Sequence, residues 1–113
     1  MVPPEVRAAL DALRRQTLER VQDLERDRSR IVDASRSSNA DDEHDPEGST
    51  LSGEWSQVDA LRRATVSELA DVEDALTRME GGSYGVCIVC GRDIPRARLE
   101  ARPMVRTCVG CAV

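Results

Sequence analysis

Four cysteines in two matched pairs constrain the fold of this chain more than any other feature. The pairs are Cys87-Ile88-Val89-Cys90 and Cys108-Val109-Gly110-Cys111, with seventeen residues between them and no other cysteine in the sequence. A CxxC turn presents two thiolates to one metal ion, and two such turns complete a tetrahedron around zinc. A four-thiolate site has no open position for water or substrate. We therefore predict one structural zinc ion bound by Cys87, Cys90, Cys108 and Cys111.

The alternatives to a zinc site are a pair of disulfides or four unrelated thiols. The first residues, Met1-Val2-Pro3-Pro4-Glu5, contain no apolar run of the kind found in secretory signals. We therefore expect a cytoplasmic protein, and paired CxxC turns in a reducing compartment favour metal over disulfides. The sequence has no stretch of about eighteen apolar residues, so we expect no association with a membrane.

The composition indicates a chain that cannot build a large core. Of 113 residues 40% are hydrophobic and 33% are charged, with one Trp, one Tyr and no Phe. Small chains with a thin core usually need an additional constraint such as a bound metal. The cysteine pairs and the composition therefore agree.

Residues 5–38 are predicted to form one long helix. Its apolar residues are spaced mostly three or four apart, with Thr17 and Arg28 interrupting the stripe; they are Val6, Leu10, Leu13, Val21, Leu24 and Ile31. Pro3 and Pro4 suit the entry to a helix. We expect helical charge pairs such as Glu25 with Arg28 to add small local support.

Residues 54–80 are predicted to form a second long helix, beginning near Ser52 as N-cap and ending at Gly81-Gly82. Steps of three and four separate Trp55, Val58, Leu61, Thr65, Leu69, Val72, Leu76 and Met79. This stripe is one seam wide, which is typical of a coiled coil. A linker short enough to return the chain favours an antiparallel hairpin over an intermolecular coiled coil.

The predicted fold class is thus mainly α, a long antiparallel helical hairpin followed by a small C4 zinc finger. The expected domains are a hairpin at 1–80, with an acidic tip at about 39–53, and a zinc-finger module at 81–113. In the linker five acids fall within seven positions, and Pro46 and Gly48 are expected to break any helix there. A solvated loop is the simple interpretation of this composition. A carboxylate cluster that approaches a metal or a basic surface of a partner is the functional one.

Charge is distributed unevenly along the chain. Residues 1–80 contain eleven Arg and nineteen acids, a net charge of −8, whereas residues 81–113 contain five Arg and two acids, a net charge of +3; the sum is the −5 of the whole chain. A zinc ion with four thiolates carries a formal charge near −2. The arginines of the last segment either offset that charge or form a binding surface.

The finger residues together resemble the DksA/TraR zinc-finger family. The resemblance covers about residues 81–111, including Gly82-Ser83-Tyr84-Gly85-Val86, Gly91, Leu99 and Ala101, and reproduces the family spacing through Cys90, Ile94, Arg98, Pro103 and Cys108. A helical hairpin with an acidic tip before the finger is also similar to that family.

The resemblance implies a non-enzymatic transcription regulator that binds RNA polymerase and not DNA. In that family the hairpin enters the secondary channel, its tip approaches the catalytic centre, and initiation is altered. By this resemblance Asp42, Asp45 and Glu47 are the tip residues, and Arg98 and Arg102 contact the polymerase or form structural ion pairs. We expect no direct DNA binding, because a net-negative chain is not attracted to phosphates. We also expect a monomer.

Three departures from the family pattern bear on this function. With Asp42 and Asp45 as the two tip acids, Glu47 stands where the family has Ala; aligned instead on Asp45-Pro46, the second acid is Glu47 and the Ala position resembles Ser49. Ile88 replaces an acid or Ser, and the sequence ends at Val113 where longer members continue into a C-terminal helix. Members that respond to guanosine tetraphosphate use basic residues at positions that resemble Asp71 and Ala112 here, while Arg102 is kept. We therefore expect a weak or absent response to this alarmone.

Two other functions remain open. A nucleic-acid-binding zinc ribbon would use the basic end but lacks an aromatic platform and a net positive charge. A thiol redox sensor would release zinc on oxidation, with arginines favouring the reactive thiolate. An enzyme is not expected, because no nucleophile, base and acid arrangement or phosphate loop is visible and the only histidine, His44, lies among acids.

Overall fold

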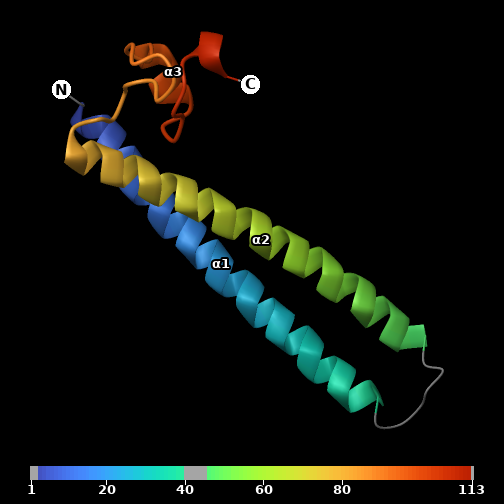
Figure 1. Ribbon diagram of the computed structural model, residues 1–113. Helices are drawn as coiled ribbons and strands as arrows, with labels where there is room; N and C mark the ends of the chain where they lie inside the picture. Colours follow the sequence, from blue (N-terminus) through green and yellow to red (C-terminus); the bar gives the residue numbers. More distant parts are fainter. Residues whose placement is uncertain (1–2, 40–45, 113) are drawn as a thin grey trace. The chain divides into compact units, whose positions relative to one another are not determined.

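The computed structural model describes residues 3–39 and 46–112, which form two compact units. One unit combines the chain up to Gln16 with the chain from Glu68 onward, and the other is Thr17–Ser67. Helix α1 (Pro4–Asn39) and helix α2 (Pro46–Gly81) contribute to both units, and α3 (Arg96–Ala101) and the short 3-10 helix η1 (Val109–Cys111) follow. Within each unit α1 and α2 lie side by side and run in opposite directions (Figure 1). The predicted class, a helical hairpin followed by a C4 finger, is confirmed.

Helix α2 begins well before the predicted start. It includes Pro46 and Gly48, so the prediction that these residues break any helix and that Ser52 is the N-cap is wrong. A proline at the first helical position costs little, because the N–H that it lacks would have no intrahelical partner. A single glycine costs about 1 kcal/mol, which the remainder of a long helix outweighs. Asp42 and Asp45 lie outside the described residues, and so does the side chain of Glu47.

The predicted stop of α2 at the two glycines is confirmed. Gly82 has φ of 82°, a left-handed conformation that glycine adopts without steric cost. The N–H groups of Ser83 and Tyr84 both donate to the carbonyl of Arg78, at 2.9 and 3.1 Å. These bonds satisfy a carbonyl at the helix end and turn the chain toward the finger.

The first unit has the larger apolar core. Its buried members are Val6 and Leu10 of α1, Val72 and Ala75 of α2, and Tyr84 after α2, with Leu13, Leu76, Met79, Leu99 and Met104 packed against them. Leu10 and Val72 have no exposed surface. The Tyr84 hydroxyl donates to the carbonyl of Pro103 at 2.9 Å, and burial raises its pKa. This core joins the helices directly to the finger segment.

The second unit contains a buried carboxylate, Asp59, surrounded by arginines from both helices. The Asp59 side chain is only 5% exposed, and the Nε atoms of Arg28 and Arg62 lie 3.4 and 3.6 Å from its carboxylate. Arg63 donates to the same carboxylate from Nε at 2.8 Å. The guanidinium of Arg28 also lies 5.2 Å from the centre of the Trp55 ring, a cation–π distance. A buried carboxylate therefore collects three arginines where a coiled coil would have an apolar seam.

The second unit corrects three sequence predictions. Leu61, predicted in the seam, is 47% exposed, because Asp59 is turned toward α1 instead. Arg28 pairs with Asp59, and not with Glu25, whose carboxylate lies 3.9 Å from Arg62. Thr17, predicted to interrupt the stripe, is buried. Of the two interruptions in the apolar pattern, Thr17 is buried, whereas Arg28 is partly exposed and lies 3.4 Å from the buried Asp59 carboxylate.

Asp59 is expected to make the second unit sensitive to acid. The hydrogen bond from Arg63, together with the charges of Arg63, Arg28 and Arg62, lowers its pKa below the usual 3.8 although burial opposes this. Its contribution to stability is therefore complete above about pH 4 and is lost as pH falls through the lowered pKa. Asp59→Asn should lower the melting temperature at pH 7 and flatten its decline below pH 4, measured by circular dichroism. Asp11→Asn, on an exposed side chain, should melt like the parent at both pH values.

No helix within residues 3–39 or 46–112 has an apolar stretch long enough to cross a lipid bilayer.

Candidate metal centre

The first CxxC turn is held between two backbone contacts. Val86 and Asp93 form an isolated antiparallel bridge, and the N–H of Ile94 donates to the carbonyl of Gly85 at 2.7 Å. Inside this loop the N–H of Cys87 donates to Arg92 at 2.8 Å, and that of Gly91 donates to Cys87 at 3.0 Å. Gly91 has φ of 73°, so the tight turn after Cys90 needs a residue without Cβ. These bonds fix the backbone of the first CxxC turn.

The second CxxC turn coincides with η1. The N–H groups of Cys111 and Ala112 donate to the carbonyl of Cys108, at 3.1 and 3.0 Å. The N–H of Ile88 donates to the carbonyl of Arg106 at 3.0 Å, which joins the first turn to the segment before the second. Backbone hydrogen bonds thus bring the two cysteine pairs together without any strand.

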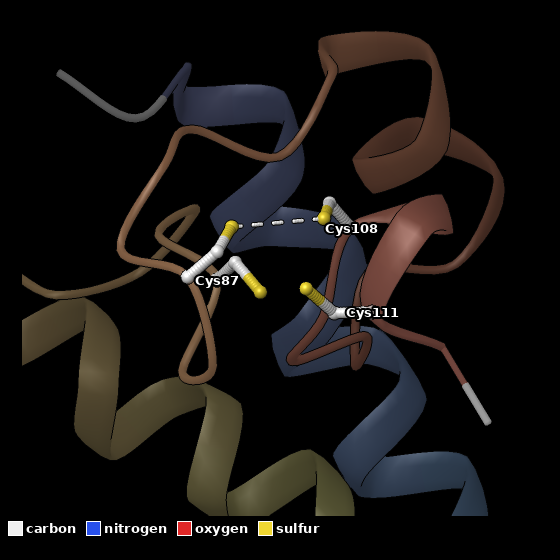
Figure 2. A group of neighbouring side chains, drawn as sticks. Cys87, Cys108 and Cys111 are labelled. Atoms are coloured by element: carbon white, nitrogen blue, oxygen red, sulfur yellow. Dashed lines mark hydrogen bonds between the residues drawn. The ribbon is translucent and has the colours of Figure 1, made fainter.

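The four sulfur atoms form one compact cluster. All lie within 4.8 Å of one another, and the Sγ atoms of Cys90 and Cys108 are 3.8 Å apart. Figure 2 shows the side chains of Cys87, Cys108 and Cys111 converging on a common space, with a dashed line at the Cys90–Cys108 contact. Zinc–sulfur bonds of about 2.3 Å place tetrahedral sulfurs about 3.8 Å apart. The cluster therefore fits one zinc ion.

The same distances argue against disulfides. A disulfide joins its sulfurs at about 2.05 Å, and all four cysteines are free. Backbone N–H groups, first that of Cys90 and then that of Cys108, lower the pKa of Cys87 to about 6. Hydrogen bonds to Cys108 and Cys87 raise the pKa of Cys111 to about 12, because a further charge beside those sulfurs is unfavourable. A divalent cation removes that repulsion, and zinc would displace the protons.

Arg98 makes a contact within the finger, whereas the sequence left open whether it contacts a partner or has a structural role. Its Nε donates to the carbonyl of Thr107 at 2.9 Å, directly before Cys108. Arg102 is exposed, and within the described part of the chain its side chain has no hydrogen bond or ion pair. The two arginines proposed together from the sequence thus occupy different environments. Their roles in binding a partner stay predictions.

Arg98 and Arg102 form a matched pair for mutation. Arg98→Ala should destabilise the finger by about 1–3 kcal/mol, because the Thr107 carbonyl loses a charged donor. Competition with a chromogenic chelator should show weaker zinc binding for this variant. Arg102→Ala should retain the zinc affinity and the melting temperature of the parent. Equal zinc affinity in the two variants would contradict the structural role of Arg98.

Comparison with known proteins agrees with the geometry of the centre. Residues 82–113, which contain all four cysteines, match the family described as the prokaryotic dksA/traR C4-type zinc finger. The chain belongs to this DksA/TraR family. The predicted zinc finger is thereby confirmed, with four cysteines placed to bind one structural zinc ion.

Relatives of this DksA/TraR chain are aligned over part of their length. It is 39% identical to General stress protein 16O of Bacillus subtilis (strain 168) over 77 residues, 64% of this chain and 44% of that protein. It is also 39% identical to the uncharacterized protein YbiI of Escherichia coli (strain K12) over 62 residues, 50% of this chain and 67% of that protein. Three curated relatives are matched over less than half of their own length, at 38%, 16% and 44%.

A solved structure has the same fold. The transcription factor DksA2 from Pseudomonas aeruginosa matches with a TM-score of 0.57 and 22% identity, over 91% of this chain and 79% of that one. At this identity the likeness shows the fold alone. Both the helical pair and the finger therefore belong to a known architecture.

Proposed function

We propose that this chain is a non-enzymatic transcription regulator that binds RNA polymerase through the secondary channel. The hairpin formed by α1 and α2 enters the channel, and Asp42, Asp45 and Glu47 approach the catalytic centre and alter initiation. Zinc holds the finger that anchors the base of the hairpin. The observation that carries this proposal is the DksA2-like fold over 91% of the chain combined with a C4 finger of the DksA/TraR family.

The charge of the chain supports a protein partner. Residues 1–80 carry a net charge of −8, which opposes approach to the phosphates of DNA. Among residues 3–39 and 46–112, the four cysteines are the one group of three or more side chains placed to hold a metal. Since four thiolates complete a zinc tetrahedron, this site offers no position for substrate. Regulation by binding therefore fits the chain better than catalysis.

The proposal is tested with bacterial RNA polymerase core and holoenzyme. The wild-type chain should be retained by immobilised core and should change abortive initiation on a ribosomal promoter. Asp42→Asn/Asp45→Asn should still bind but lose the effect on initiation, because the anchoring surfaces remain and the tip charge is removed. Retention is measured by pull-down and initiation by short labelled transcripts.

The matched control changes two acids away from the proposed tip. Asp11→Asn/Glu19→Gln removes the same formal charge from exposed positions of α1 and should regulate like wild type. Absence of retention at micromolar concentrations would exclude polymerase as the partner. Equal loss of regulation in both variants would show that total charge, and not the tip, is responsible.

We expect guanosine tetraphosphate to have little effect on this regulator. Asp71 and Ala112, which stand at the positions where responsive family members are basic, are both exposed and provide no cation for a phosphate. The initiation assay is repeated with alarmone from zero to about a 100-fold excess over protein, which saturates a site of micromolar affinity. The regulation should be the same at every alarmone concentration. A dose-dependent change that requires this protein would contradict the expectation.

A further inference from the structure

The two CxxC turns expose three large apolar side chains. Ile88 is 59% exposed, Val89 is 68% exposed and Val109 is 69% exposed. They lie between the cysteines of the two turns, and Val89 and Val109 are adjacent to Cys90 and Cys108, whose sulfurs are 3.8 Å apart. Exposed aliphatic side chains are hydrated unfavourably, and contact with a partner would remove that unfavourable hydration.

Two arginines accompany these apolar side chains. The carbonyl of Arg106 accepts a hydrogen bond from Ile88, and the carbonyl of Arg92 accepts one from Cys87, so both residues adjoin the first turn. Both side chains are exposed, and neither has a hydrogen bond or ion pair with any residue that the structure describes. In contrast, Arg96 is paired with Glu100 at 3.0 Å and Arg98 with Thr107. We name Ile88, Val89, Val109, Arg92 and Arg106 the knuckle surface.

We propose that the knuckle surface docks a protein segment in which apolar side chains alternate with carboxylates. Ile88, Val89 and Val109 would cover the apolar side chains, and Arg92 and Arg106 would pair with the carboxylates. The proposal does not depend on polymerase binding or on the helical hairpin, because every residue of the knuckle surface belongs to the finger.

The charge and composition of the surface favour this occupant over others. Residues 81–113 carry +3, and of their two acids Glu100 is paired with Arg96, while Asp93 follows Arg92 in the sequence. Neutralising the charge of a zinc–thiolate centre does not by itself explain Arg92 and Arg106, because neither guanidinium donates a hydrogen bond to a cysteine sulfur in the described finger. Nucleic acid would gain little from three aliphatic side chains, and the one aromatic residue of the finger, Tyr84, is buried.

The probe is a synthetic helical peptide in which leucine and glutamate side chains alternate along the same face. It is titrated into the zinc-loaded full chain, and methyl and amide chemical shifts are followed by NMR. Saturable shifts are expected at Ile88, Val89 and Val109. A peptide with lysine in place of glutamate should bind about tenfold more weakly, and one with serine in place of leucine should not shift these methyls.

Protein variants separate the two parts of the surface. Val89→Ser/Val109→Ser should weaken binding about tenfold, and Arg92→Gln/Arg106→Gln should abolish the preference for glutamate over lysine. Leu61→Ser/Val66→Ser removes exposed apolar side chains from α2 and is the matched control, which should bind like the parent. Zinc content, measured for every variant, confirms that the finger is intact.

Several results would overturn the proposal. They are no shift at millimolar peptide, equal binding of the lysine and glutamate peptides, or loss of binding in the Leu61→Ser/Val66→Ser control. Shifts of the knuckle methyls with protein concentration alone would assign the surface to a second copy of the chain. Stronger shifts with a single-stranded oligonucleotide than with the glutamate peptide would assign it to nucleic acid.

Discussion

Cys108→Ser is expected to abolish stoichiometric zinc binding and unfold the finger. Four thiolates complete the coordination of zinc, and structural zinc contributes on the order of 10 kcal/mol to the folding of small zinc fingers. Cys108 also supplies the carbonyl that accepts from Cys111 and Ala112, so a loosened turn frees both ends of η1. Zinc content should fall from one ion per chain to near zero, measured by metal analysis after gel filtration.

The melting behaviour of this variant gives a second measurement. The parent should lose stability when a chelator is added, whereas Cys108→Ser should already melt at the lower temperature and ignore the chelator. Val109→Ser changes the next residue, which is 69% exposed, and should keep its zinc and the parental melting curve. A Cys108→Ser variant that melts like the parent with zinc would show that the metal has no structural role.

Leu10→Ala is expected to lower the free energy of unfolding by about 2–5 kcal/mol. Leu10 has no exposed surface and belongs to the cluster with Val72, Ala75 and Tyr84. Truncation removes apolar contacts and leaves a cavity in a core that few residues surround. Urea unfolding followed by circular dichroism should show a lower midpoint with a similar slope.

The matched control for this prediction is Leu61→Ala. Leu61 is also a helical leucine of the predicted apolar stripes but is 47% exposed. Its truncation should change the free energy of unfolding by no more than about 0.5 kcal/mol. Equal destabilisation by the two variants would mean that Leu61 is buried in solution and that the apolar seam of the second unit is as the sequence alone predicts.

The sequence by itself determined the metal chemistry and the order of the elements. Two CxxC pairs specify their ligand geometry locally, because each turn presents two thiolates whatever surrounds it. The stripes of apolar residues determined two long helices, and Gly82 determined where α2 ends, because a residue without Cβ is favoured at positive φ. These features depend on short-range spacing, which a single sequence displays.

Only the tertiary structure decided which side chains are buried between the helices. Asp59 lies next to Val58 of the predicted apolar stripe, and nothing in the local sequence marks its side chain as buried. Its carboxylate faces Arg28, a residue of α1 that is far away in the sequence. Arg98 and Arg102 are the same residue type in the same segment, but among the described residues only Arg98 has a hydrogen-bond acceptor nearby, the carbonyl of Thr107. Likewise Arg106 adjoins Ile88 only because the Ile88 N–H donates to the Arg106 carbonyl, eighteen positions later in the sequence. Such contacts join distant parts of the chain, so no local pattern encodes them.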